Sequence, residues 1–312
     1  DIVAYATSKN ITIIPEIEMP GHSVSVLAAY PEFACTSATT PFSVRCAWGI
    51  STDILCGGKE SVRTFLKDVL EEVAELFPGK YIHIGGDEAP KNNWNTCDDC
   101  KARIVSKGIT GADQTAKSNT LQKELVEEMA QFLAPKGKTV IGWDEVTHGG
   151  IPTGATIQAW NVGVNVGQIT SAGHDVIMSN YTKLYLDSKQ STEVGEPGAT
   201  WMGYNTLDVV YNYDPMPSGL TTSQQARVLG PEACIWTEEL QTSEVVEYML
   251  VPRLQAMAER AWTPNSLVNF EDFKSRLVSH FERFEYLNFN SRKLPVPQSS
   301  TKSIVSCEPV VL

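Results

Sequence analysis

Residues 81–90 read YIHIGGDEAP, and this stretch decides the fold. Its first four residues are a short run rich in β-branched and aromatic side chains, which predicts a buried strand. Two glycines then free the backbone, and the carboxylates of Asp87 and Glu88 follow at once. Adjacent side chains on a regular strand face opposite ways, so both carboxylates can serve one site only where the strand gives way to a loop. We favour a functional pair over the alternative, an acidic dipeptide on a solvated turn.

Similar apolar runs recur along the chain and alternate with amphipathic stretches. Strands are predicted at residues 11–16, 81–84, 139–143, 156–160, 175–178 and 233–236, and helices at 61–77, 119–133, 243–262 and 270–286. This alternation predicts parallel βαβ units. Polar or aromatic residues end nearly every strand, which is how a (β/α) barrel builds its active site. A doubly wound nucleotide-binding sheet is disfavoured because the sequence has neither glycine-rich phosphate motif.

The number of predicted strands bears on the domain organisation. Eight βα units close a (β/α)8 TIM barrel, so six predict an α/β chain of that lineage without its first two units. Residues 1–6 read as the middle of a helix, which places the missing units before residue 1. We expect a partial barrel catalytic domain over residues 1–292. Residues 293–312 then form a tail, or the start of a following segment.

Composition excludes several classes of function. The 312 residues are 42% hydrophobic and 20% charged, an ordinary globular balance. No apolar run approaches the ~18–20 residues that a membrane helix needs, so we expect no membrane span in this chain. The formal net charge is −12, and Lys and Arg do not cluster. Nucleic-acid binding, which needs a basic face, is therefore not expected.

The cysteines bear on metal binding and on compartment. Cys97 and Cys100 have the spacing of half a zinc ribbon, but the chain has no second Cys-x-x-Cys. A local disulfide or two free thiols in a polar loop is therefore favoured over zinc. Cys35, Cys46 and Cys56 share a Thr/Ser-rich loop that disulfides would staple in an oxidising compartment. We expect an exported protein (periplasmic, cell-surface or secreted), with no metal and no cofactor.

Further candidate site residues follow the other strands. His22 comes after a Pro-Gly turn and is expected to line the site as a hydrogen-bonding side chain. Tyr185 and Asp187 are two residues apart, so they share one face of an extended segment, and Glu238 repeats this geometry after the last strand. An aromatic box around a sugar face or an acetamido methyl is expected from three strand-end residues, Trp143, Trp160 and Trp236. Together these residues predict a carbohydrate site.

Two other classes of function were weighed. A metal-dependent barrel hydrolase would use His22, His83, Asp87 and Glu145 as ligands, but it is disfavoured because the sequence has no His-x-His pair. A non-catalytic sugar-binding protein is disfavoured because the acidic pair is intact.

Six motifs in order resemble one known family. HIGGDEAP, PEIEMPGH, GWDEV, IQAW, YLD and GPEACIWTE, taken with their positions along the chain, are similar to the catalytic domain of glycoside hydrolase family 20, the β-N-acetylhexosaminidases. The resemblance runs from residue 1 to about residue 292. It implies a retaining exo-enzyme that removes terminal GlcNAc or GalNAc from β-linked oligosaccharides or glycoconjugates. Catalysis in this family is assisted by the substrate and passes through an oxazolinium intermediate.

The resemblance also implies roles for residues. Glu88 would be the general acid and then the base, and Asp87 would hold the acetamido N–H of the substrate. Tyr185 would donate a hydrogen bond to the acetamido oxygen, and His22 would belong to a supporting network. The other substrate-binding residues would wall the acetamido pocket, bind hydroxyls or stack on the next sugar, namely Trp143, Trp160, Trp236, Asp187, Glu238 and Trp201.

The sequence departs from the family pattern in two ways. Glu18 stands where the family commonly has Asp. In addition, the family's sugar-binding Arg, its second strand and its small N-terminal α+β domain have no match. The expectation that follows is that these parts precede residue 1, which leaves an inactive fragment as an alternative reading of the chain.

Overall fold

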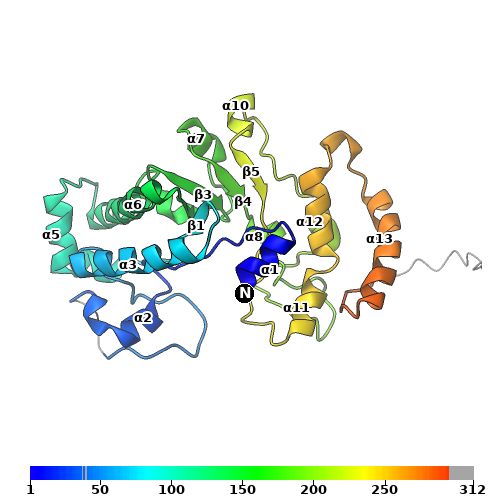
Figure 1. The fold of residues 1–312 in the computed structure, drawn as a ribbon, viewed down its shortest axis with the longest axis horizontal. Coiled ribbons are helices and arrows are strands. Elements are labelled where there is room, and N and C mark those ends of the chain that lie inside the picture. Colours follow the sequence, from blue (N-terminus) through cyan, green and yellow to red (C-terminus); the bar gives the residue numbers. More distant parts are fainter. Residues whose placement is uncertain (37, 39–40, 295–312) are drawn as a thin grey trace, which may run out of the picture.

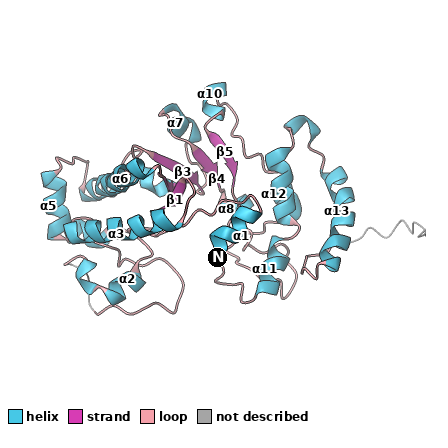
Figure 2. Cartoon of the chain, in the orientation of Figure 1, coloured by secondary structure: helices cyan, strands magenta, loops and turns pink. Residues whose placement is uncertain are grey.

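The computed structural model describes residues 1–36, 38 and 41–294, and a parallel sheet lies at its centre (Figures 1 and 2). The strands are β1 (Tyr81–His83), β2 (Thr139–Trp143), β3 (Ala155–Ala159), β4 (Val176–Met178) and β5 (Val228–Pro231). They follow one another across the sheet in chain order, and all neighbours are parallel. Each strand must therefore be joined to the next by a crossover that returns to the same edge. The prediction of an α/β fold built from βα units is confirmed.

The main hydrophobic core lies between the sheet and two long helices. Helix α3 (Glu60–Leu76) confirms the helix predicted at 61–77, and α6 (Gln114–Leu133) begins five residues before its predicted start. The earlier start is explained by Asp113, whose side chain accepts a hydrogen bond from the N–H of Ala116 and caps the helix. Both helices pack leucines against fully buried residues of the strands. They therefore cover one face of the sheet and shield it from solvent.

A second, smaller core lies on the other side of the molecule in Figure 1, around α12 (Arg253–Trp262) and α13 (Phe270–Tyr286). The single helix predicted at 243–262 is wrong: the structure has α11 (Ser243–Leu250) and then α12. Pro252 separates them, because proline has no N–H to donate to the preceding turn. The helix predicted at 270–286 is confirmed as α13.

The two outer strands differ from the prediction. Residues 11–16 make only an isolated parallel bridge, from Glu16 to His83 beside β1. The last strand, β5, ends at Pro231, and residues 233–236 contribute only a bridge between Tyr185 and Cys234. Gly230 has φ +136 and Pro231 lacks an N–H, so the regular ladder ends there. The strand at 233–236 was thus placed too late by the sequence pattern.

Shorter helices fill the connections: α1 (Ile2–Ser8), α2 (Val24–Ala29), α4 (Asn92–Thr96), α5 (Asp98–Ser106), α7 (Val166–Ser171), α8 (Tyr181–Leu184), α9 (Leu207–Tyr211) and α10 (Thr222–Gln225). Within the described residues, no helix is long and apolar enough to span a bilayer. The tail predicted at 293–312 falls almost wholly outside the described residues.

Candidate active site

The acidic pair lies in the loop that follows β1. Gly85 and Gly86 have φ +64 and +96, and Glu88 also has a positive φ of 43, so the strand geometry ends before the carboxylates. Two neighbours fix this loop. The N–H of Trp143 donates to the carbonyl of Gly85 at 2.9 Å, and the Gln122 amide donates to the carbonyl of Gly86 at 2.6 Å.

His22 brings the two carboxylates to one point. Its Nε2 lies 3.2 Å from Asp87 Oδ2 and 3.4 Å from Glu88 Oε2. A hydrogen bond to Asp87 and, to a smaller extent, one to Glu88 raise the pKa of His22 to about 10. The imidazole is therefore charged at neutral pH. Gly21, just before it, is required by close packing, because a Cβ there would lie 2.8 Å from the Asp87 carbonyl oxygen. Asp87 and Glu88 therefore both contact one imidazole.

Aromatic side chains form a continuous wall beside the pair. The ring of Tyr185 stacks on Trp160 with centroids 6.0 Å apart and lies 6.2 Å from the ring of Trp236. Trp143 lies 6.2 Å from Trp236 on the other side. Trp143 and Tyr185 are buried, whereas Trp236 is 38% exposed, so the wall opens towards solvent at Trp236. Burial raises the pKa of the Tyr185 phenol, which therefore stays a hydrogen-bond donor.

Carboxylates from neighbouring strand ends orient two of these indoles. Trp143 Nε1 donates to Glu16 Oε1 at 2.9 Å, and Trp160 Nε1 donates to Glu145 Oε2 at 2.8 Å. Burial raises the pKa of Glu145 to about 7. A buried indole N–H needs a partner, so these pairs fix the direction of each ring.

The four ligands of the metal-hydrolase alternative do not come together as one set. Among the described residues, His22 and Asp87 group with Glu88, whereas His83 lies 3.2 Å from Glu16 and Glu145 binds Trp160.

A cavity of about 690 Å³ opens in front of the acidic pair, and six of the predicted site residues line it, namely His22, Glu88, Asp187, Trp201, Trp236 and Glu238. Asp187 is buried, which raises its pKa to about 7, and Glu238 is exposed at the rim. Trp201 is exposed and stacks on Tyr181, with ring centroids 5.5 Å apart. Three predicted residues do not line the cavity but contact residues that do: Asp87 contacts His22, and the rings of Trp143 and Tyr185 contact Trp236. Trp160 is one layer further away and stacks on Tyr185.

Two features in and around the cavity were not predicted from the sequence. Trp48 and Ile50, from the loop between α2 and α3, also line it. Arg253 is fully buried and donates to the carbonyls of Ser188 and Leu186, on either side of Asp187. No periodicity marks the loop, so nothing in the sequence signalled Trp48. A buried arginine in an amphipathic helix could have been noticed, because it breaks the apolar stripe of α12.

Aromatic rings beside carboxylates at the carboxyl ends of parallel strands define a carbohydrate-binding class of site. A family model described as "Glycosyl hydrolase family 20, catalytic domain" matches residues 1–265. The chain belongs to this family.

Known relatives agree with this assignment. The chain is 41% identical over 299 residues to a β-hexosaminidase of Porphyromonas gingivalis, covering 96% of this chain and 37% of that protein. It is 32% identical to a β-hexosaminidase of Akkermansia muciniphila, covering 92% and 57%. Among solved structures, it is similar to the exo-β-N-acetylglucosaminidase of Vibrio harveyi in complex with N-acetylglucosamine, with TM-score 0.82, 30% identity, and 94% and 45% covered. The chain thus spans about half the length of the relatives it matches.

Proposed function

We propose that the protein is a retaining exo-β-N-acetylhexosaminidase that removes terminal GlcNAc or GalNAc from β-linked glycans. The observation that carries this proposal is the meeting of Asp87 and Glu88 at one imidazole, beside an aromatic wall and a cavity. Most glycosidases place two carboxylates about 5–9.5 Å apart across the scissile bond. Neighbouring carboxylates on the same loop suit a reaction in which the substrate itself supplies the nucleophile.

Glu88 is the proton donor in this proposal. Its carboxyl group protonates the glycosidic oxygen while the acetamido oxygen of the substrate attacks C1, so that the aglycone leaves and a cyclic oxazolinium forms. The Glu88 carboxylate then takes a proton from water as that water attacks C1 and opens the ring. The proton and the configuration at C1 are both restored, and the reaction balances without a cofactor.

Asp87 and His22 shape the charge around this step. Asp87 accepts the acetamido N–H and stabilises the positive charge that develops on the ring, because a fixed anion beside a forming cation acts most strongly where water is excluded. The charged His22 lies between Asp87 and Glu88, and its positive charge offsets the repulsion between the two carboxylates.

The wall and the rim bind the sugar. Tyr185 donates to the acetamido oxygen, and the tryptophans at 143, 160 and 236 enclose the acetamido methyl and one sugar face. Asp187 and Glu238 accept hydrogen bonds from sugar hydroxyls, and the exposed ring of Trp201 stacks on the next sugar.

The test is hydrolysis by the purified protein of two chromogenic substrates that differ only at C2, an N-acetyl-β-glucosaminide and a β-glucoside. The proposal expects turnover of the first alone, with the β-anomer of the free sugar formed first in an NMR time course. Equal rates on both substrates would show that the acetamido group is not the nucleophile.

A further inference from the structure

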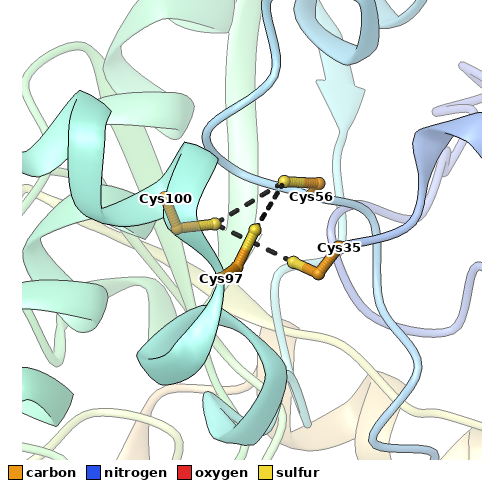
Figure 3. A group of neighbouring side chains, drawn as sticks. All are labelled: Cys35, Cys56, Cys97 and Cys100. Carbon is orange, nitrogen blue, oxygen red and sulfur yellow. Dashed lines mark hydrogen bonds between the residues drawn. The ribbon is translucent and has the colours of Figure 1, made fainter. Parts of the chain in front are cut away.

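Four cysteines from three parts of the chain meet in the main core (Figure 3). The Sγ atoms of Cys56 and Cys100 are 3.6 Å apart, those of Cys56 and Cys97 are 3.8 Å apart, and those of Cys35 and Cys100 are 3.9 Å apart. All four sulfurs lie within 4.8 Å of one another, and all four residues are buried. We refer to Cys35, Cys56, Cys97 and Cys100 as the cysteine cluster.

The backbone around the cluster is built for this approach. An antiparallel bridge between Ala34 and Leu55 sets Cys35 beside Cys56. The backbone after Cys56 presses against the first turn of α5, because a Cβ on Gly58 would lie 2.2 Å from the carbonyl carbon of Asp99. Only glycine permits that contact. The N–H of the buried Trp94 indole donates to the Leu55 carbonyl at 2.9 Å and fixes the same loop from the other side.

The Cys-x-x-Cys pair lies at the start of a helix, not in a polar loop as its sequence suggested. Cys97 is the N-cap of α5 and Cys100 is in the first turn, so both sulfurs point to one side of the helix start. The positive end of the helix dipole favours thiolates there. The Thr36 hydroxyl lies 3.7 Å from Cys97 Sγ and can donate to it.

We propose that the cysteine cluster binds one Zn²⁺ ion as a structural site. Four thiolates around zinc at about 2.3 Å form a tetrahedron with sulfur–sulfur edges of about 3.8 Å. The three close contacts, at 3.6, 3.8 and 3.9 Å, match those edges.

The contacts join all four sulfurs into one set and do not divide them into two pairs. Cys56 contacts both Cys97 and Cys100, and Cys100 also contacts Cys35. Two disulfides would need two isolated pairs about 2.05 Å long. Four protein ligands leave no open position, so the ion is structural and not catalytic.

The site ties a functional loop to the barrel helices. Cys35 and Cys56 stand at the two ends of the segment that carries Trp48 and Ile50, which line the cavity of the candidate active site. One ion would thus anchor both ends of this segment on α5. The metal site itself does not depend on the proposed enzymatic function.

The first test is the metal content of the wild-type protein, purified without added metal under reducing conditions. We expect one zinc per chain by elemental analysis, and X-ray absorption showing four sulfur neighbours at about 2.3 Å. A metal-free protein with these four thiols titratable would overturn the proposal. So would an intact mass that shows disulfides between them, or stoichiometric iron in place of zinc.

The second test assigns the ligands. Cys35→Ser and Cys97→Ser should lower zinc affinity by about 100-fold or more, since losing even a partner of a ligand costs about 10–100-fold. Cys46→Ser is the matched control, because Cys46 is exposed and outside the cluster, and it should keep the full zinc content. Equal zinc content in all three variants would contradict the assignment.

Cobalt exchanged into the wild-type protein tests the site even if a ligand variant does not fold. Thiolate-to-cobalt charge-transfer bands are expected, and their absence would refute the site.

Discussion

The candidate active site, called the cleft from here on, and the cysteine cluster are both built from residues far apart in the chain. They are assembled by different means. In the cleft, the parallel sheet brings the residues together, because the carboxyl ends of its strands meet at one edge. Asp87, Trp143 and Trp160 lie at or just after the ends of strands that pair directly. The cysteine cluster has no such frame. It joins two loop positions to a helix start, through contacts as close as that of Gly58 with Asp99.

This difference separates chemistry from anchoring. The cleft is a charged cavity open to solvent, as a site that binds substrate and releases product must be. The cluster is closed and buried within the core, as suits a site that holds one ion permanently. Substitutions in the cleft should therefore lower turnover and leave the stability of the fold unchanged. Substitutions in the cluster should lower stability and leave turnover nearly unchanged.

The largest effect is expected at the proton donor. Glu88→Gln keeps the size of the side chain and an acceptor for His22 but has no proton to give. The turnover number on a substrate with a poor leaving group should fall by about 10²–10⁴-fold, with the melting temperature and zinc content unchanged. Steady-state kinetics and thermal unfolding of the same preparation check both halves. Near-normal turnover would remove Glu88 from its role.

Loss of a cluster ligand should act mainly on stability. Cys97→Ser is expected to lower the free energy of unfolding by about 4 kcal/mol or more, because the zinc-binding energy is lost together with a buried ligand. The turnover number of the protein that remains folded should stay within about twofold, since neither the ion nor the cavity-lining segment that it anchors carries the acidic pair. Denaturant unfolding with activity measured in parallel tests this. A large loss of turnover at unchanged stability would erase the contrast between the two regions.

Arg253 links stability to the cleft, so its replacement should have a mixed and smaller effect. Arg253→Lys keeps the charge but loses the fork of donors that binds the carbonyls of Leu186 and Ser188. We expect a loss of about 1–3 kcal/mol of stability, from unpaired buried carbonyls, and a higher KM through displaced Asp187. Arg276→Lys is the control, because Arg276 is half exposed and its ion pairs contribute about 0–1 kcal/mol. Equal effects of the two variants would contradict this positioning role.

The smallest effect is a pH dependence of stability due to His22, because solvent screens the ion pairs of a side chain that is 35% exposed. Its pKa is raised from 6.5 to about 10 in the folded protein, so its contribution is fully present below about pH 6.5 and is lost as the pH rises through about 10. Unfolding free energies across this range should fall less steeply in His22→Gln than in wild type. His148→Gln, at an exposed position, is the control. A slope that His22→Gln leaves unchanged would show that His22 is not held by the acidic pair.

Features governed by periodicity and by sheet geometry could be predicted from the sequence. The strand and double glycine before Asp87 predicted where the pair lies, and the tryptophans that end strands predicted the wall. The split of residues 243–262 was missed because the apolar stripe continues past Pro252. A strand was wrongly predicted at 233–236 because the apolar run there continues after the ladder of β5 has ended. Trp48 and the completion of the cysteine cluster depend on long-range contacts: the Cys-x-x-Cys spacing signalled one half of the cluster, but no local pattern showed that Cys35 and Cys56 supply the other half.

In the proposed reaction, the acetamido group of the substrate is the nucleophile beside Asp87 and Glu88. The most direct test is kcat/KM for a series of chromogenic N-acyl-β-glucosaminides in which the acetyl methyl carries none to three fluorines. Each fluorine withdraws electrons from the carbonyl oxygen and makes it a poorer nucleophile. If the acetamido group is the nucleophile, kcat/KM should fall steadily along the series, although the substrates differ little in bulk. A flat series would contradict it, because the acetamido group would then be bound but would not react.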